Sequence, residues 1–540
     1  MNFSGSLDIL TLEVAVSKLA LSWQLDEVIE LDSIEKTIGA LLSHRASVNP
    51  DLEALVGPKR RFTYAEFEEI ANRIGHWLLD HGVRKGERVM VFSETNVIFP
   101  LVYFGAAKIG AITVAANWRW TPELTRWAVE YTEPTVIFYD ESFRNLIHSL
   151  NLNGIQAVQT SYRLDLEWQW ETALYKYPAT PPEADICGKD PVCITFTSGT
   201  TGRPKGVVIT HNNIYAAGIH YGFFTPIRKA GHRLLYVTPL FHISGTGNIG
   251  FMPLCGYTFV FMPQPEPELL LETIERERVN SVFLVPAMLG LMLPFIYKSG
   301  KTLRLLEEIL TAGSPVPEKL IREYETLGFN IVQGYGMTEC TGNITIWFPT
   351  MGYDTCASVG KPFMNEICIL DHQTREVLPP GKIGELAVRG PIVFKEYWRD
   401  PDATRKAFHN GWFLSGDAAR MDERGFVYIV DRYKDVIYIS GFDAIYPSPV
   451  EAELRKLDGV SDVALIGVQH QHYGEISCAF IVRKPEAGLT HEQVLKFVHS
   501  RMEKHKVMAV HFVEQIPRND LGKVDKAALK KIYQETAEQT

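Results

Sequence analysis

The residues best suited to chemistry lie in a loop within Ile194–His211, which reads ITFTSGTTGRPKGVVITH. Its glycines let backbone N–H groups approach an anion closely, and its hydroxyls and lysine add donors and a positive charge. The loop is not a Walker loop, because Gly-x-x-x-x-Gly-Lys-[Ser/Thr] is absent and no helix signal follows at once. A flexible polar turn would explain the glycines but not the hydroxyls packed with them. We therefore expect a polyphosphate site formed by Thr197, Ser198, Gly199, Thr200, Thr201, Gly202 and Lys205.

Other polar motifs follow predicted strands, where open α/β sheets place ligands. Tyr335–Glu339 (YGMTE) offers an aromatic face for a purine, a hydroxyl for a phosphate oxygen and a carboxylate for Mg²⁺. Asp417 follows a glycine turn and has the oxygens to bind both hydroxyls of a ribose. Taken singly, both motifs are also explained as ordinary turns. By themselves, Arg432, Lys434 and Lys523 would be solvated charges.

The elements that must position these residues alternate between strands and helices. Val89–Ser93 is a predicted strand, Val97–Ile109 a helix and Ala111–Ala115 a strand, and this alternation continues along most of the chain. Helices of this length between strands imply parallel sheets with crossover connections. Thr63–His81 is a further predicted helix, which begins with a Thr-x-x-Glu capping box.

We expect an α/β protein in three parts. Residues 1–32 form an N-terminal extension with a loosely helical stretch, which could dock on the main body or on a second subunit, so a homodimer is left open. Residues 33–433 form a large body of mixed and parallel sheets covered by helices, and from about residue 358 it becomes a β-rich subdomain. Residues 434–540 form a small α+β domain.

The bulk properties exclude several functions. A chain of 540 residues is too long for one core, and its net charge of −10 argues against nucleic-acid binding. Seven scattered cysteines without CxxC spacing indicate neither a disulfide framework nor a zinc site and fit a reducing cytoplasm. No secretory signal is visible. The longest apolar run, Phe283–Tyr297, is too short to cross a bilayer, and we expect it to be buried.

Together and in this order, the motifs resemble those of the adenylate-forming superfamily of acyl- and aryl-CoA synthetases, luciferases and peptide-synthetase adenylation domains. The similarity extends from about Ile34 to Leu529, and the phosphate loop is its most specific element. Supporting matches are Tyr335–Glu339, Gly384–Gly390, Gly411–Asp417, Asp431-Arg432 and Arg518–Lys523. The chain is most like fatty- or aryl-acyl-CoA ligases.

The resemblance implies a reaction in two steps. A carboxylate attacks the α-phosphate of ATP and releases pyrophosphate, and a thiol, commonly that of coenzyme A, then displaces AMP from the acyl adenylate. In the first step the carboxylate must approach the α-phosphate, another anion, while negative charge builds on the departing pyrophosphate. Preorganised hydrogen-bond donors and cations are therefore the main source of catalysis.

The resemblance also implies a role for each matching residue. Thr197–Lys205 would hold the β- and γ-phosphates, Thr338 the α-phosphate and Glu339 the magnesium ion. Tyr335 would stack on adenine beside Gly313 and Ser314, and Asp417 and Arg432 would bind the ribose. Lys523 would bridge the acid and the α-phosphate. The small C-terminal domain would turn about Lys434 between the two steps.

The acid and the thiol are less defined. His242 stands where amino-acid-activating relatives have an aspartate, which argues for an acid without an amine, although a core histidine is an alternative. Asn248 and Asn343 could bind a polar group of the acid. In Ser440–Glu451 the family pattern is altered: either Phe442 replaces a usual glycine or one residue is inserted, and Pro449 stands where glutamate is usual. The acceptor is therefore coenzyme A or the phosphopantetheine of an acyl carrier protein.

We expect an ATP- and Mg²⁺-dependent acyl-CoA synthetase. An acyl-AMP ligase that loads a carrier protein is the first alternative. A luciferase-type oxidative enzyme and a non-catalytic nucleotide-binding protein are the others. The joint presence of Lys205, Glu339 and Lys523 argues against the last of these.

Overall fold

The computed structural model describes residues 37–160, 169–197, 203–224, 230–263, 265–299, 303, 305–314, 316–439, 443–470, 474–485, 487–502, 506–518 and 524–537. The predicted N-terminal extension therefore lies outside the described residues, as do Ser198–Gly202 and Lys523.

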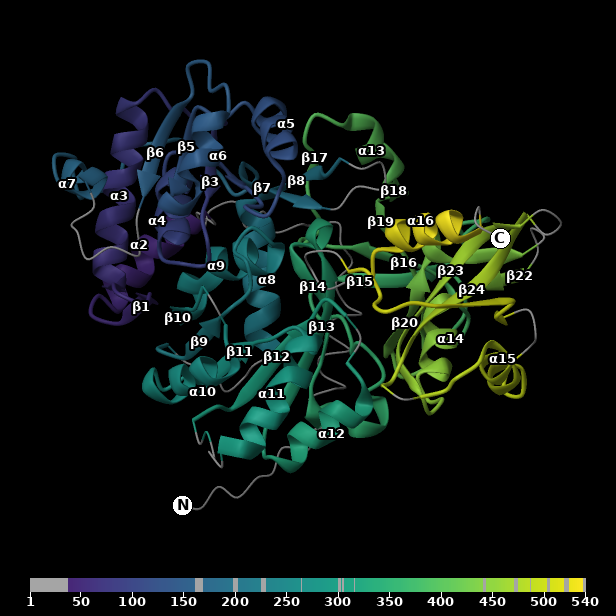
Figure 1. The fold of residues 1–540 in the computed structure, drawn as a ribbon. Helices are drawn as coiled ribbons and strands as arrows, with labels where there is room; N and C mark the ends of the chain where they lie inside the picture. The colour runs from purple at the N-terminus through teal and green to yellow at the C-terminus, as the bar shows by residue number, and fades with distance from the viewer. Residues whose placement is uncertain are drawn as a thin grey trace, which may run out of the picture.

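The first large sheet has seven strands in the order β17-β8-β7-β4-β3-β5-β6 (Figure 1). Its parallel strands are β3 (Arg88–Phe92), β4 (Ile112–Ala115), β5 (Val136–Asp140), β6 (Gln156–Thr160) and β7 (Pro191–Thr197). The remaining two strands, at the edge next to β7, are antiparallel to their neighbours: β8 (Lys205–Thr210) and β17 (Glu396–Tyr397). The predicted phosphate loop is therefore the connection of the β7–β8 hairpin, with Thr197 paired to Lys205.

The second large sheet has eight strands in the order β14-β13-β12-β11-β9-β10-β1-β2. Its parallel strands are β1 (Glu53–Val56), β9 (Arg233–Tyr236), β10 (Thr258–Phe261), β11 (Ser281–Phe283), β12 (Glu308–Ala312) and β13 (Asn330–Met337). Antiparallel strands β2 (Arg61–Thr63) and β14 (Gly342–Trp347) close the two edges.

Helices pack between and around these sheets. α3 (Tyr64–Asp80) begins with the predicted capping box of Thr63 and Glu66, and all residues of α4 (Ile98–Ala107) are buried because this helix is apolar all round. One core cluster joins both sheets through these helices. The other helices of the body are α2 (Ile38–Val48), α5 (Pro122–Thr132), α6 (Arg144–Ser149), α7 (Gln169–Leu174), α8 (His211–Phe224), α9 (Ile243–Cys255), α10 (Pro267–Arg276), α11 (Pro286–Ser299) and α12 (Glu318–Thr326).

The expectation for Phe283–Tyr297 was only partly right. The segment contains the end of β11 and most of α11, and Leu289 and Met292 are buried. Leu291 and Tyr297 are 64% and 59% exposed, because α11 lies on the surface and turns only one face inward. No helix among the described ranges is both long and apolar enough to cross a membrane.

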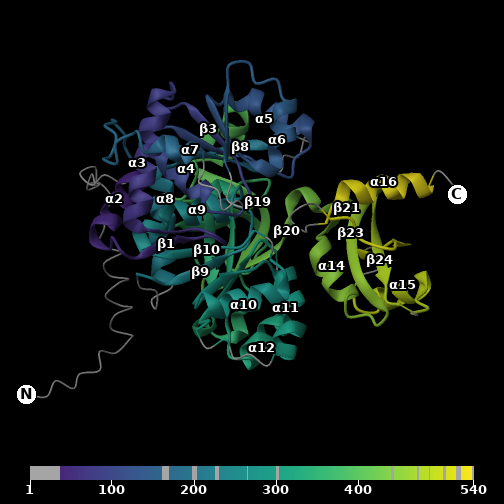
Figure 2. The same cartoon turned by 60° about the vertical axis from the view of Figure 1, so that its left-hand side comes forward.

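The chain then builds a five-stranded sheet and a separate C-terminal part. The sheet contains β15 (Glu366–Leu370), β16 (Gly384–Arg389), β18 (Phe408–His409), β19 (Trp412–Met421) and β20 (Val427–Arg432), and α13 (Pro401–Lys406) precedes β18. The C-terminal part stands beside the body, as Figure 2 shows. Its elements are β21 (Ile437–Ile439), β22 (Asp443–Ile445), α14 (Pro447–Leu454), β23 (Val460–His470), β24 (Gly474–Arg483), α15 (His491–His499), β25 (Ala509–Phe512) and α16 (Lys526–Ala537).

One hydrogen bond crosses the junction between the two parts. The backbone N–H of Ser448, at the start of α14, donates to the Asp431 carboxylate on β20 over 2.7 Å. Asp431 is buried and Ser448 is exposed, so this bond is partly shielded from water.

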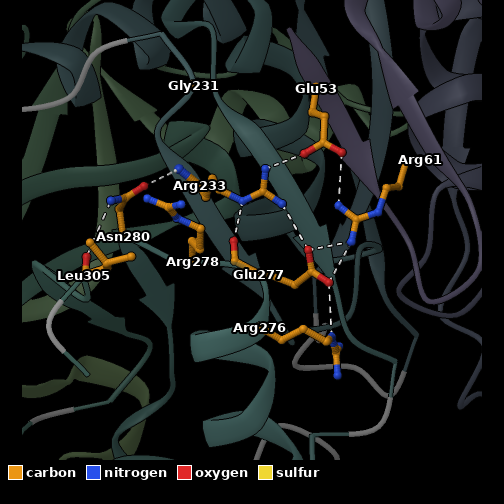
Figure 3. Close-up of a pocket in the computed structure, with 9 residues that line it drawn as sticks. All are labelled: Glu53, Arg61, Gly231, Arg233, Arg276, Glu277, Arg278, Asn280 and Leu305. Carbon is orange, nitrogen blue, oxygen red and sulfur yellow. Dashed lines mark hydrogen bonds and ion pairs between the residues drawn. The ribbon is translucent and has the colours of Figure 1, made fainter. Parts of the chain in front are cut away.

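A cluster of charged side chains around the buried Glu277 links β1 and β2 to β9 and to the end of α10 (Figure 3). Arg61 donates to both carboxylate oxygens of Glu277 over 2.8 and 2.7 Å, and Arg233 and Arg276 each donate to it over 3.2 Å. Arg61 and Arg233 also bind Glu53. Burial alone would raise the pKa of Glu277, but hydrogen bonds from Arg61 and Arg276 and the charges of Arg61 and Arg233 bring it below its ordinary value.

Glu277→Gln should lower the free energy of unfolding by about 2–3 kcal/mol at pH 7, because a buried carboxylate that serves three arginines is lost. The folded-state pKa of Glu277 is lowered. Its contribution is therefore present above the ordinary glutamate pKa of about 4.3 and is lost as the pH falls below it. The measurement is the urea midpoint at pH 7 and pH 4, where the gap between variant and parent should narrow at pH 4. Glu272→Gln, at an exposed site on α10, is the control. Equal midpoints at pH 7 would contradict the prediction.

Candidate active site

A cavity of about 1120 Å³ opens where strands of both large sheets end. Ala115 and Thr197 line it from the ends of β4 and β7, and Thr238 and Gly313 line it just beyond β9 and β12. Ligands of open α/β sheets bind at the carboxyl ends of the strands, and this cavity has that position.

The expected site residues fall into four groups. Those that line the cavity are Thr197, His242, Gly313, Ser314, Thr338, Glu339 and Arg432. Lys205 and Asp417 contact the lining residues Tyr397 and Arg432, and Tyr335 is hydrogen-bonded to Asp417. Lys434 lies in a short 3₁₀ turn after β20 and is not among the lining residues described. Ser198, Gly199, Thr200, Thr201, Gly202 and Lys523 lie outside the described residues.

Glu339 brings a carboxylate to the cavity from the 3₁₀ turn Thr338–Cys340, directly after β13. The Tyr397 hydroxyl donates to this carboxylate over 2.9 Å. Burial raises the pKa of Glu339, although its hydrogen bonds and the charges of Arg432 and Lys205 oppose the rise. Lys205 lies with its Nζ 4.7 Å from the centre of the Tyr397 ring. Lys205 of the β7–β8 hairpin and the Glu339 carboxylate therefore both contact Tyr397.

Asp417, Arg432 and Tyr335 come from three strands and form one cluster. Asp417 and Arg432 are cross-strand partners on β19 and β20, and the Arg432 Nε lies 3.0 Å from an Asp417 oxygen. The Tyr335 hydroxyl donates to the other oxygen over 2.6 Å. Asp417 is thereby fixed in orientation, as an acceptor for a pair of ligand hydroxyls must be.

His242 precedes α9 as its N-cap residue and contributes to the cavity wall beside Asn248 and Asn343. Its ring centre lies 4.4 Å from that of Phe241. Gly245 is required here, because a Cβ at this position would lie 2.5 Å from the Leu240 Cα. The turn before α9 therefore holds His242 close to the cavity.

The C-terminal part reaches the same cavity. Asp525, which follows the isolated bridge between Arg518 and Val524, is one of the lining residues. Lys523 is two positions before it in the sequence.

Sequence reasoning missed Tyr397, Trp118 and Asp525, all of which line the cavity. Tyr397 lies 58 residues from its partner Glu339, and no local pattern marked the pairing. The one available signal was its place in the segment just after Gly384–Gly390, which belonged to the resemblance.

The fold and the cavity define an enzyme that binds a nucleotide and activates a second substrate beside it. The chain belongs to the AMP-binding enzyme family: the main domain of the family matches residues 42–398, and its C-terminal domain matches residues 449–523. The expected membership of the adenylate-forming superfamily is confirmed.

Three known proteins illustrate the range of relatives. The long-chain-fatty-acid–CoA ligase FadD13 of Mycobacterium tuberculosis is 32% identical over 93% of this chain and 99% of its own. The fatty acid–[acyl-carrier-protein] ligase ScoC of Streptomyces coeruleorubidus is 29% identical over 91% of this chain and 95% of its own. The o-succinylbenzoate coenzyme A synthetase MenE of Bacillus subtilis, solved with ATP and a magnesium ion, superposes with a TM-score of 0.79 at 27% identity, covering 91% of this chain and 99% of its own. The expected fold class is confirmed.

Proposed function

We propose that this protein activates a fatty or aryl carboxylic acid with ATP and transfers the acyl group to coenzyme A. A carboxylate oxygen forms a bond to the α-phosphorus and pyrophosphate leaves. The thiol sulfur then bonds to the acyl carbon, its proton is lost and AMP leaves. The expected reaction class, that of an AMP-forming acid–thiol ligase, is confirmed by the family and by the relatives. The identity of the acid belongs to the proposal.

The observation that carries the proposal is the convergence of separate motifs on one cavity. Thr197, Glu339 and Arg432 line it from three parts of the chain, and Asp525 brings the C-terminal part to the same place. A protein that only bound nucleotide would not need the C-terminal segment there.

We assign the roles as the resemblance implied. Thr197–Lys205 holds the β- and γ-phosphates, and Thr338 binds the α-phosphate. Gly313, Ser314 and Tyr335 bind adenine. The oriented pair of Asp417 and Arg432 binds the ribose. His242 contacts the acid.

Glu339 fits a magnesium ion. Its carboxylate is buried at the cavity with a raised pKa, so a nearby cation would favour its ionised form. No group of three or more His, Cys, Asp or Glu that could hold a metal is found in the described part of the chain. A single carboxylate suits Mg²⁺, which keeps several waters and binds substrate phosphates. When bound, the ion would neutralise charge on the phosphates.

The C-terminal part acts as a mobile lid in this proposal. Residues 33–433 form the body and residues 434–540 the lid, with Lys434 at the hinge. The lid delivers Lys523 to the α-phosphate and the acid for the first step and withdraws it for the second. The presence of Asp525 at the cavity supports an arrangement suited to the first step.

Tyr397→Phe should reduce acid-dependent ATP–pyrophosphate exchange about tenfold or more, because the carboxylate of Glu339 loses a charge-assisted hydrogen bond. That bond lowers the pKa of Glu339, so its loss should raise this pKa and move the acidic limb of the pH–rate profile to higher pH. Exchange is measured from pH 5 to 9, with Tyr297→Phe as an exposed control. An unchanged profile would remove Tyr397 from this role.

The function is tested by pyrophosphate release across fatty, aromatic and hydroxylated acids, with the products identified by mass spectrometry. Release should depend on an acid, and coenzyme A should yield a thioester and AMP. Carrier-protein loading is the second candidate, because Pro449 lies in α14 where glutamate is usual and ScoC is a relative. An acyl carrier protein that is acylated while free coenzyme A is not would favour that candidate.

A further inference from the structure

One wall of the cavity gathers polar groups from β9 and from the start of α9. Tyr236 is fully buried, and burial raises the pKa of its phenol to about 12. The side chains of Ser244, Thr238 and Asn248 lie close enough to the phenol to oppose part of that rise. These three side chains line the cavity, whereas Tyr236 contacts them and is not itself among the lining residues described. We call Thr238, Ser244 and Asn248 the polar wall.

The polar wall has hydrogen-bonding capacity left over. Within the described ranges, the Thr238 hydroxyl is buried without a partner in full hydrogen-bond geometry, is only 7% exposed and has the Tyr236 phenol as a polar neighbour. Trp118 also lines the cavity, and its indole N–H is likewise buried without a hydrogen-bond partner among the described residues. Each such group costs about 1–3 kcal/mol when it is left unsatisfied, so a ligand oxygen placed there would recover that energy.

Aromatic side chains form the neighbouring walls. Trp118 meets Phe241 edge to face with ring centres 6.1 Å apart, and Tyr221 meets Phe251 at 5.3 Å. All four rings line the cavity. Stacked and edge-on contacts of this kind favour a flat ring in the ligand.

Positive charge is scarce on these walls. Among the lining residues described, the guanidinium groups are those of Arg119 and Arg432. Arg119 is exposed and lies over the Trp118 ring, and Arg432 is paired with Asp417. Burial lowers the pKa of His220 to about 4, so this lining residue is neutral at pH 7. Arg119 is therefore the lining guanidinium that a second carboxylate on the acid could meet, and an exposed arginine offsets little of the cost of burying that charge.

We propose that the acid is an aromatic acid that carries a neutral hydroxyl or carbonyl group, which the polar wall binds. This rests on the proposed function and narrows its substrate to one chemical class. The polar wall would determine which acid is selected, whereas the residues assigned to the phosphates and the ribose would bind ATP.

The test compares matched acids by kcat/KM for pyrophosphate release: cinnamate, 4-hydroxycinnamate, 4-carboxycinnamate and octanoate. The hydroxylated acid should exceed cinnamate by about tenfold or more, because the site otherwise leaves its own polar groups unpaired. Octanoate and the dicarboxylate should both be poorer than 4-hydroxycinnamate.

Thr238→Val should bring the kcat/KM ratio of 4-hydroxycinnamate to cinnamate towards one. Tyr236→Phe, which acts only by positioning the Thr238, Ser244 and Asn248 side chains that it contacts, should lower the ratio to a smaller extent. The control is Thr113→Val, which removes an equally buried hydroxyl on β4 that is not among the lining residues. This variant should keep the parent ratio.

If the unmutated protein has a kcat/KM ratio of 4-hydroxycinnamate to cinnamate near one, or prefers octanoate or 4-carboxycinnamate, the inference is overturned. The proposed function would still stand. A parent ratio that survives in both Thr238→Val and Tyr236→Phe would also overturn it. Pyrophosphate release with none of these acids or of the wider screen would refute the proposed function itself.

Discussion

Replacing Lys523 with alanine should lower acid-dependent ATP–pyrophosphate exchange by about a thousandfold or more. The carboxylate and the α-phosphate are both anions, and Lys523 is the cation that we place between them in the first step. ATP binding should change little, because the phosphate hairpin and the Asp417–Arg432 pair remain. Exchange of labelled pyrophosphate measures the first effect, and a nucleotide-binding titration measures the second.

The second half-reaction separates Lys523 from a general structural role. When a preformed acyl adenylate is supplied, Lys523→Ala should still form thioester, because this lysine is withdrawn for that step. The control is Lys530→Ala, at an exposed site on α16. Unchanged exchange in Lys523→Ala would remove this residue from the mechanism.

Glu339→Gln should also reduce exchange by about a thousandfold, because the change removes the charge that we assign to magnesium binding and leaves the shape of the side chain. The glutamine can still accept the Tyr397 hydrogen bond. Exchange measured over a range of Mg²⁺ concentrations should show a much higher requirement for the ion.

The control for Glu339→Gln is the same change at Glu376, which is exposed. If the variant keeps both the parent rate and the parent Mg²⁺ requirement, Glu339 is not the metal ligand.

Local pattern was enough to predict most elements of the fold. The strand predicted over Val89–Ser93 is β3 (Arg88–Phe92), shifted by one residue, and the predicted helix Thr63–His81 is α3 with its capping box in place. These signals depend on residues within one strand or one turn, so neighbours in sequence carry them. Helix ends were harder to place. The helix predicted over Val97–Ile109 ends at Ala107, and Gly110 follows shortly after with a positive φ of 70°.

The candidate site was only partly predictable, because its contacts join distant residues. Tyr335 and Asp417 were both selected from motifs, but their hydrogen bond spans 82 positions and depends on the packing of two sheets. Asn248 of the polar wall was expected to bind a polar group of the acid, but Tyr397 and Thr238 had no chemical motif of their own. A tyrosine or a threonine is common in any strand, and only burial against a cavity gives it a role.

The hydrogen bond between Ser448 and Asp431 bears on how much ATP the reaction consumes for each thioester formed. Asp431 directly precedes Arg432, so the strand end to which we assign ribose binding is also bonded to the start of α14. In the proposed mechanism, any swing of the lid away from α14's present position must break this part-buried bond. An acyl adenylate is exposed to water once the lid opens, so the lifetime of this one bond would influence how many adenylates are hydrolysed before a thiol arrives. The yield of thioester per ATP consumed, more than the speed of either step, would then depend on Asp431.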